Sequence, residues 1–112
     1  MMDAILSEGL ARVRRRFVEE LGPRRDRLVM LREEGEQTKW AQEQVTSIGR
    51  IAHKIAGTAA TVGFEKLGAI AAELDDLTTR EMTDGDMLSI EIVRRLENVI
   101  ALSDHILAEQ NS

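Results

Sequence analysis

Residues 41–63 read AQEQVTSIGRIAHKIAGTAATVG and carry the clearest pattern in the chain. The apolar residues of this stretch recur at alternating steps of four and three, which places them on one face of a helix. They are Ala41, Val45, Ile48, Ala52, Ile55, Ala59 and Val62. This unbroken seam predicts a long amphipathic helix that ends at Gly63 and buries the seam against other helices.

Stripes of the same period on both sides predict further helices. A first helix is expected over about residues 3–21, and Gly22-Pro23 should break or kink it before a second helix that ends near Gly35. Directly after Gly63 another helix is expected, with Phe64, Leu67, Ile70, Ala71, Leu74 and Leu77 on its stripe. Residues 83–86, TDGD, predict a loop in which Asp86 is the N-cap of a last helix over about residues 87–108.

Amphipathic helices with short connections can bury their stripes only against each other. The sequence therefore predicts an all-α fold, an antiparallel four-helix bundle with an additional N-terminal helix. The chain of 112 residues has the length of a single domain, which we expect to span residues 1–112. Its 43% hydrophobic, 31% charged and only 3% aromatic residues suit helices better than a sheet.

Composition also limits the classes of function. The chain contains no cysteine, and Asp3 and Glu8 interrupt its first apolar residues, so we expect a cytoplasmic protein without a signal peptide. No apolar run approaches the length of a membrane span. A net charge of −5 argues against nucleic acid or an anionic membrane as a partner, and polar exposed faces favour a monomer.

One basic cluster stands out against the net negative charge, and acidic residues are interleaved with it. Its members are Arg12, Arg14, Arg15, Arg16, Arg24, Arg25 and Arg27. The cluster is either a solvated helix face with local ion pairs or a surface that docks on an acidic partner.

His53 is the candidate functional residue. On a helical wheel it lies about 160° from Ile55, so it should project into solvent from the middle of its helix. The residues around it on that face are nearly all small: Gly49, Arg50, Ala56, Gly57 and Ala60.

A glycine inside a helix costs about 1 kcal/mol relative to alanine. A patch poor in side chains would allow another protein to approach the imidazole, and we interpret these five residues as a docking surface. His105, near the end of the last helix, is assigned no function.

An exposed imidazole is largely neutral at neutral pH and offers a nucleophilic nitrogen. Attack on a phosphoryl group requires in-line access and positive charge near the phosphoryl oxygens, which Lys54 could supply. A helical hairpin turning at Gly63 would bring residues 73–76 level with His53. Of the carboxylates there, Asp75 should face the imidazole more directly than Glu73 or Asp76, and could orient the ring.

Residues 52–64, AHKIAGTAATVGF, resemble the signature of histidine-containing phosphotransfer (HPt) domains. His53, Gly57 and Gly63 match the phosphorylated histidine and the two glycines of that pattern, and Leu67 and Leu74 match its apolar continuation. The resemblance implies a four-helix bundle that exchanges a phosphoryl group on His53 with receiver-domain aspartates of response regulators or of a hybrid histidine kinase. It implies a phosphocarrier with no catalytic turnover of its own and no cofactor, the Mg²⁺ being supplied by the receiver.

Two other functions compete with the phosphocarrier. Many HPt domains carry a lysine three residues after the histidine, where this chain has Ala56, so an HPt-like docking module that binds or inhibits a kinase or response regulator is the main alternative. The dimerisation hairpin of a histidine kinase also exposes a helical histidine. That hairpin usually has an acidic residue directly after the histidine and a proline a few residues later, where this chain has Lys54 and Thr58.

Overall fold

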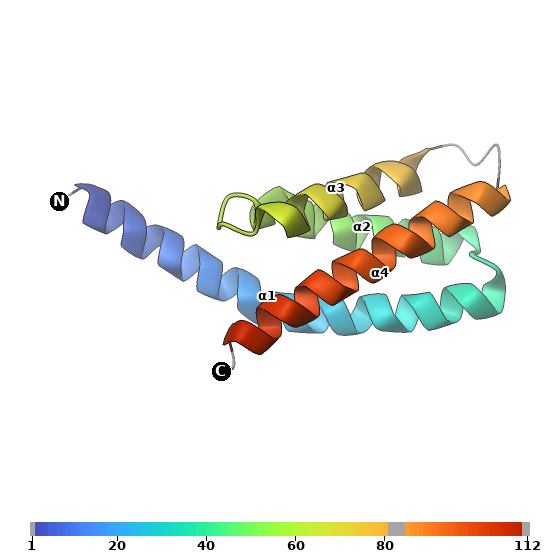
Figure 1. The fold of residues 1–112 in the computed structure, drawn as a ribbon, viewed down its shortest axis with the longest axis horizontal. Coiled ribbons are helices and arrows are strands. Elements are labelled where there is room, and N and C mark those ends of the chain that lie inside the picture. The colour runs from blue at the N-terminus through green and yellow to red at the C-terminus, as the bar shows by residue number, and fades with distance from the viewer. Residues whose placement is uncertain (1, 81–84, 111–112) are drawn as a thin grey trace.

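The computed structural model describes residues 2–80 and 85–110. Within these residues the protein is all-α and contains no strand. The helices are α1 (Met2–Thr38), α2 (Gln42–Ala59), α3 (Glu65–Thr79) and α4 (Gly85–Gln110), and successive helices run in opposite directions (Figure 1). The predicted fold class is confirmed at this level.

The four helices form a ring in which each packs against two others. In the described part of the chain, α2 packs on α1 and α3, α4 also packs on α1 and α3, and neither diagonal pair of helices brings Cα atoms within 8 Å of each other. The first part of α1 extends beyond the end of the other helices, next to the turn that joins α2 to α3 (Figure 1). The bundle proper is therefore built from the remainder of α1 and the other three helices.

The prediction of two helices before residue 38 is wrong, because α1 is one helix of 37 residues with Pro23 inside it. A proline within a helix removes a hydrogen bond and costs about 3 kcal/mol. The apolar face nevertheless keeps its phase across Pro23: Phe17 and Leu21 before it and Leu28 and Leu31 after it are all buried. Packing of this continuous face keeps the chain helical, and α1 changes direction near its middle (Figure 1). The expected additional N-terminal helix is the first part of α1.

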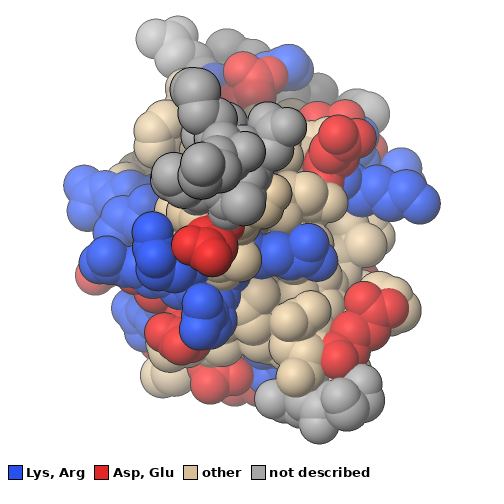
Figure 2. Space-filling model, turned by 90° about the vertical axis from the view of Figure 1, so that its left-hand side faces the viewer, with Lys and Arg blue, Asp and Glu red and all other residues tan. Residues whose placement is uncertain are grey.

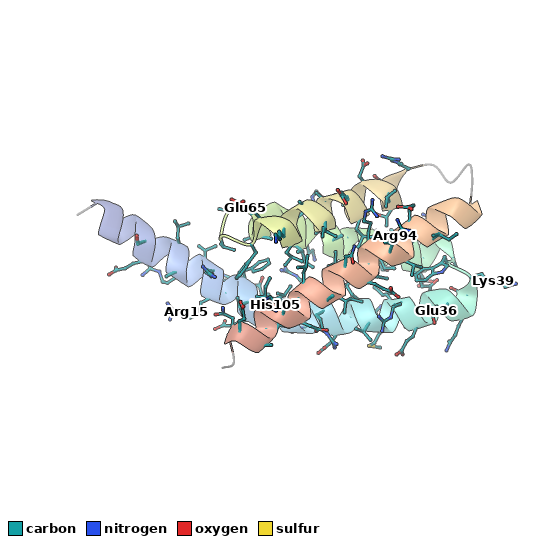
Figure 3. All side chains as sticks on the ribbon, in the orientation of Figure 1. Arg15, Glu36, Lys39, Glu65, Arg94 and His105 are labelled. Atoms are coloured by element: carbon teal, nitrogen blue, oxygen red, sulfur yellow. The ribbon has the colours of Figure 1, made fainter. Side chains whose placement is uncertain are left out.

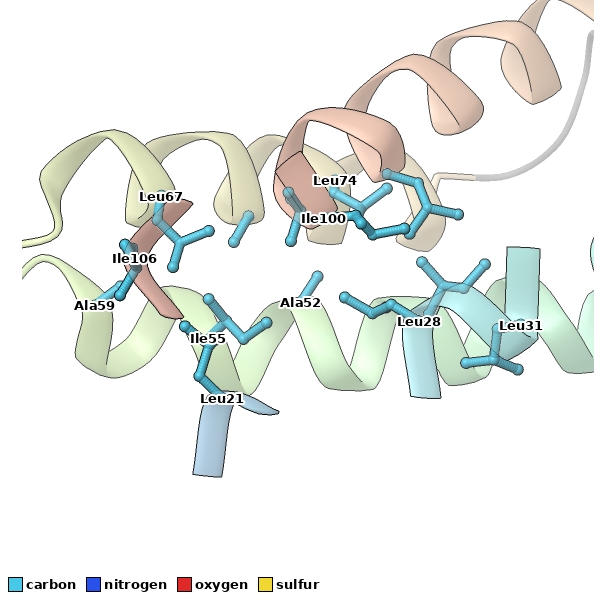
Figure 4. Close-up of a cluster of buried hydrophobic side chains, with 14 of the residues drawn as sticks. Leu21, Leu28, Leu31, Ala52, Ile55, Ala59, Leu67, Leu74, Ile100 and Ile106 are labelled. Carbon is cyan, nitrogen blue, oxygen red and sulfur yellow. The ribbon is translucent and has the colours of Figure 1, made fainter. Parts of the chain in front are cut away.

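The core follows the seam that the sequence predicts. Every seam residue that lies inside α2, from Val45 to Ala59, is fully buried. Leucine and isoleucine side chains from all four helices fill the centre of the bundle, as Figure 4 shows for Leu21, Ile55, Leu74 and Ile100. The bundle is held outside this core as well, because the Arg25 guanidinium of α1 donates to the Asp104 carboxylate of α4 at 2.6 Å. The hydrogen bond to Asp104, and to a smaller extent the one to Asp26, raises the pKa of Arg25 above its ordinary value.

The helix boundaries differ from the predicted ones at three points. The second predicted helix runs to Thr38 instead of ending near Gly35, and α2 ends at Ala59, one turn before Gly63. At the last connection, α4 begins at Gly85, so Asp86 lies inside it and is not its N-cap. Thr83 and Asp84 of the predicted loop lie outside the described residues.

The turn between α1 and α2 depends on a glycine. Lys39 and Trp40 both have positive φ angles, of 55° and 60°, which reverse the chain within a few residues. The Trp40 amide donates to the Gly35 carbonyl at 2.7 Å, and the indole lies over Gly35, which is buried. A Cβ built on Gly35 would overlap the indole ring. The indole thus covers the end of α1 only because residue 35 has no side chain. Figure 3 shows Glu36 and Lys39 at this end of the molecule.

Replacing Gly35 by alanine should lower the free energy of unfolding by about 1–3 kcal/mol, because the new methyl group displaces the indole. Gly22→Ala is the matched control: a Cβ on Gly22 meets nothing within 4 Å, so this change should be neutral or stabilise by up to about 1 kcal/mol. Urea unfolding followed by the single tryptophan would measure both. Equal stability of the two variants would contradict the role assigned to Gly35.

Candidate functional site

His53 projects from the middle of α2 into solvent and meets a carboxylate of α3. Its side chain is 78% exposed, and its Nδ1 lies 2.8 Å from Oδ2 of Asp75, whose side chain is only 26% exposed. An ionised carboxylate can only accept a hydrogen bond, so Nδ1 carries the proton and donates it. The Nε2 of the neutral ring is then unprotonated and turned away from Asp75, a nucleophile without a proton to lose.

The short turn between α2 and α3 sets the register that brings these two side chains together. Gly63 has a φ angle of +98°, which favours glycine, and the Phe64 amide donates to the Ala59 carbonyl at 2.8 Å. The Phe64 ring stacks on Phe17 of α1, with ring centroids 5.7 Å apart, and the Arg14 guanidinium lies over the Phe64 ring at 4.6 Å from its centroid. The turn is therefore packed against α1, and its geometry fixes the register of α3 relative to α2.

His53 stands at one edge of an open groove of about 620 Å³ between α2 and α3. The basic side chains Arg50 and Lys54 line the groove together with His53 and Asp75. Its remaining lining residues are Gln42, Thr46, Gly49, Thr78 and Thr79. The two basic side chains in the same groove as His53 form an environment suited to an anionic group.

The small residues around His53 are not equivalent. A Cβ on Gly57 would meet nothing within 4 Å, and Gly57 and Ala60 are exposed, so this part of the expected docking surface is open. Gly49, in contrast, is buried, and a Cβ there would overlap the Thr78 hydroxyl. The interpretation of Gly49 as part of an exposed patch is therefore wrong, because its missing side chain is filled by Thr78 of α3. Ala56 is half-buried and packs against the core.

Most arginines of the basic cluster interact with other residues of the same chain. Arg16 and Arg24 both pair with Glu20, and Arg27 lies 4.0 Å from Glu34. Figure 2, viewed toward the end that carries the N-terminus, shows the largest group of basic side chains on one side, with acidic ones interleaved. These contacts match the reading as a solvated face with local ion pairs.

His105 lies on α4, away from the groove, and its Nε2 is 3.1 Å from the Glu109 carboxylate (Figure 3). Among the described residues, no three histidine, cysteine or carboxylate side chains are grouped so that they could hold a metal ion. The described helices likewise include none with the length and apolar character needed to cross a membrane.

The model of the family described as Hpt domain matches residues 12–106, most of the chain. The chain belongs to the Hpt domain family. Comparison with curated proteins gave no match, and comparison with solved structures gave none either. Hpt domains are phosphocarrier modules of phosphorelays and interact with kinases and response regulators, so this membership supports a role in histidine phosphotransfer.

The sequence pattern predicts two features of this Hpt site and misses a third. Helical spacing places His53 in solvent, and hairpin register selects Asp75 from three neighbouring carboxylates; the structure shows both arrangements, while the chemical roles stay predictions. Thr78 was missed. It lies one turn after Asp75, and its hydroxyl donates to the Asp75 carbonyl at 2.8 Å. A threonine opposite Gly49 in the hairpin register is the signal that could have identified it.

Replacing Asp75 by alanine should shift the neutral His53 ring toward the tautomer that carries its proton on Nε2. A net hydrogen-bond contribution of about 1 kcal/mol corresponds to about a fivefold change in the ratio of the tautomers. Nitrogen-15 NMR of the imidazole, at a pH above the range in which histidines titrate, measures this ratio. Asp76→Ala is the control, since Asp76 pairs with Arg80 instead. Identical spectra for the two variants would exclude Asp75 as the group that orients the ring.

Proposed function

We propose that this Hpt domain carries a phosphoryl group on Nε2 of His53 to or from the aspartates of receiver domains in a two-component phosphorelay. The observation that supports this proposal most directly is that the two nitrogens of the imidazole have different surroundings. Nδ1 is held by a half-buried carboxylate 2.8 Å away, while the ring is 78% exposed. A partner can therefore reach Nε2 while the ring keeps one tautomer and one orientation.

Transfer from an aspartyl phosphate would proceed by in-line attack of the Nε2 lone pair on phosphorus. The P–N bond forms as the P–O bond to the receiver aspartate breaks, and the electron pair of that bond leaves on the aspartate carboxylate. The imidazole becomes positively charged as it acquires the phosphoryl group, and the Asp75 carboxylate beside Nδ1 stabilises this charge. The reverse reaction passes through the same arrangement and returns the phosphoryl group to an aspartate.

The surroundings of His53 support the rest of the reaction. Lys54 and Arg50 line the groove next to the imidazole and would attract the phosphoryl oxygens. Exposed Gly57 and Ala60 leave room on the same helix for a receiver domain to approach closely. The Mg²⁺ used in aspartyl phosphate chemistry would be supplied by the receiver. On this proposal the domain is a cytoplasmic monomer without turnover of its own.

A docking module that binds a kinase or response regulator without transfer is the second candidate. The position three residues after His53 is held by Ala56, which packs against the core and contributes no charge. On this reading the groove and the small residues would serve binding alone. Transfer of label separates the two functions.

Incubation with phosphorylated receiver domains from the same organism should label the wild type, and His53→Gln should take up no label. The bound label should be acid-labile and base-stable, as expected of a phosphoramidate. His105→Gln is the matched control and should label like the wild type, because His105 pairs with Glu109 outside the groove. Binding of receivers without any label on the wild type would favour the docking module.

Lys54→Ala should slow transfer about fivefold while leaving the fold intact, because a charge next to the phosphoryl group in a solvated groove contributes about 1 kcal/mol. Rapid-quench measurement of the rate of phosphoryl uptake tests this expectation. Lys66→Ala removes an exposed lysine of α3 that does not line the groove, and should leave the rate unchanged. Equal rates for the two variants would show that Lys54 does not stabilise the transferred group.

A further inference from the structure

Three contacts lie along the α2–α3 hairpin, in order toward the turn at Gly63. Gly49 meets Thr78, His53 meets Asp75, and Ala60 meets Gly68. The first and last are close approaches that depend on glycine. A Cβ on Gly49 would overlap the Thr78 hydroxyl and lie 3.0 Å from its Cβ, and a Cβ on Gly68 would lie 3.1 Å from the Ala60 amide nitrogen. The His53–Asp75 hydrogen bond is thus enclosed between two points at which the helices approach each other closely.

We infer that Gly49 is a positioning residue for His53: its missing side chain admits Thr78 and thereby sets the separation of α2 and α3 at which Asp75 reaches Nδ1. This inference deepens the proposed function and rests on it for its consequence in phosphoryl transfer. Gly49 lies one turn before His53, and Thr78 lies one turn after Asp75, so the two contacts are adjacent along the hairpin.

The threonine links the two levels through the backbone. Its hydroxyl donates to the Asp75 carbonyl at 2.8 Å and at the same time fills the space above Gly49. Thr78 is 9% exposed, and it is one of only two buried polar residues in the part of the chain whose burial is described. A side chain at position 49 must displace this hydroxyl, and rotation of the hydroxyl alone does not clear the contact, because the Thr78 Cβ would also lie at 3.0 Å. We therefore expect the turn of α3 that carries Asp75 to shift.

A small increase in the distance between α2 and α3 is sufficient to break the hydrogen bond between His53 and Asp75. At 2.8 Å, the His53–Asp75 contact is near its optimum, and an N–H···O bond is largely lost beyond 3.5 Å. An increase of less than one ångström in the distance between α2 and α3 is therefore enough to break this hydrogen bond. The methyl group of alanine at position 49 demands a shift of that size, because its Cβ would overlap an oxygen atom.

The test compares four proteins by nitrogen-15 NMR of the neutral His53 ring: wild type, Gly49→Ala, Thr78→Ala and the double variant Gly49→Ala/Thr78→Ala. Gly49→Ala should change the tautomer ratio about fivefold, as loss of the Asp75 hydrogen bond would. Thr78→Ala should keep the wild-type ratio. The double variant should recover at least half of the change, because removing the hydroxyl leaves only the 3.0 Å approach between the Cβ atoms.

Gly57→Ala is the matched control for the tautomer and for stability, since it introduces the same methyl group on the same helix, where nothing lies within 4 Å. Gly49→Ala in an Asp75→Ala background should produce no further change in the ratio, because the positioning acts through Asp75. A wild-type ratio in Gly49→Ala, a double variant without recovery, or an additive effect with Asp75→Ala would each overturn the inference.

Transfer rates separate this inference from the proposed function. If the wild type transfers phosphate, Gly49→Ala should slow uptake by a factor no larger than Asp75→Ala, because the Asp75 carboxylate is displaced but not removed. If the wild type transfers none but the tautomer ratios follow the expected order, the positioning role stands and the proposed function fails. Where Gly49→Ala alone does not fold, the double variant is compared with Thr78→Ala, and a partial tautomer change in the double variant alone supports the inference.

Discussion

The hydrogen bond between His53 and Asp75 joins α2 and α3, and it forms only if several other contacts align these two helices. It needs the turn at Gly63, the stacking of Phe64 on Phe17, and the close approach of Thr78 to Gly49. Each of these contacts is made by residues outside the reactive pair. The hairpin therefore acts as a frame, and an error in its register of one residue would carry Asp75 about 100° around its helix and away from the imidazole.

Partial burial determines what this hydrogen bond can do. A contact between two fully exposed side chains is weak because water competes for both groups. Here one partner is 26% exposed and the other 78% exposed, so the carboxylate is shielded while the ring remains accessible. A more deeply buried histidine would be better oriented but out of reach of a partner protein. The arrangement serves a residue that must receive a group from one protein and deliver it to another.

Pattern predicts those parts of the molecule that depend on period. The apolar seam of α2 is buried along the whole helix, and the hairpin register derived from it selects Asp75 rather than Glu73 or Asp76. Pattern fails where a local signal competes with packing. Pro23 indicates a break, yet the apolar face continues in phase on both sides of it, and tertiary burial outweighs the local cost.

Gly49 shows a different kind of failure, and the reason is geometric. A helical wheel states the direction of a residue from its own axis but not the distance to the next helix. Gly49 and Gly57 lie on either side of His53, about 80° apart on the helical wheel, and Gly49 meets Thr78 whereas Gly57 meets open space. The two glycines consequently do opposite things at the same cost in helix propensity: one brings α3 close enough for Asp75 to orient the ring, and the other keeps the approach to the ring clear. The direction of the imidazole and its accessibility are thus set by separate residues of one helix, so a change in the docking surface need not disturb the orientation of His53.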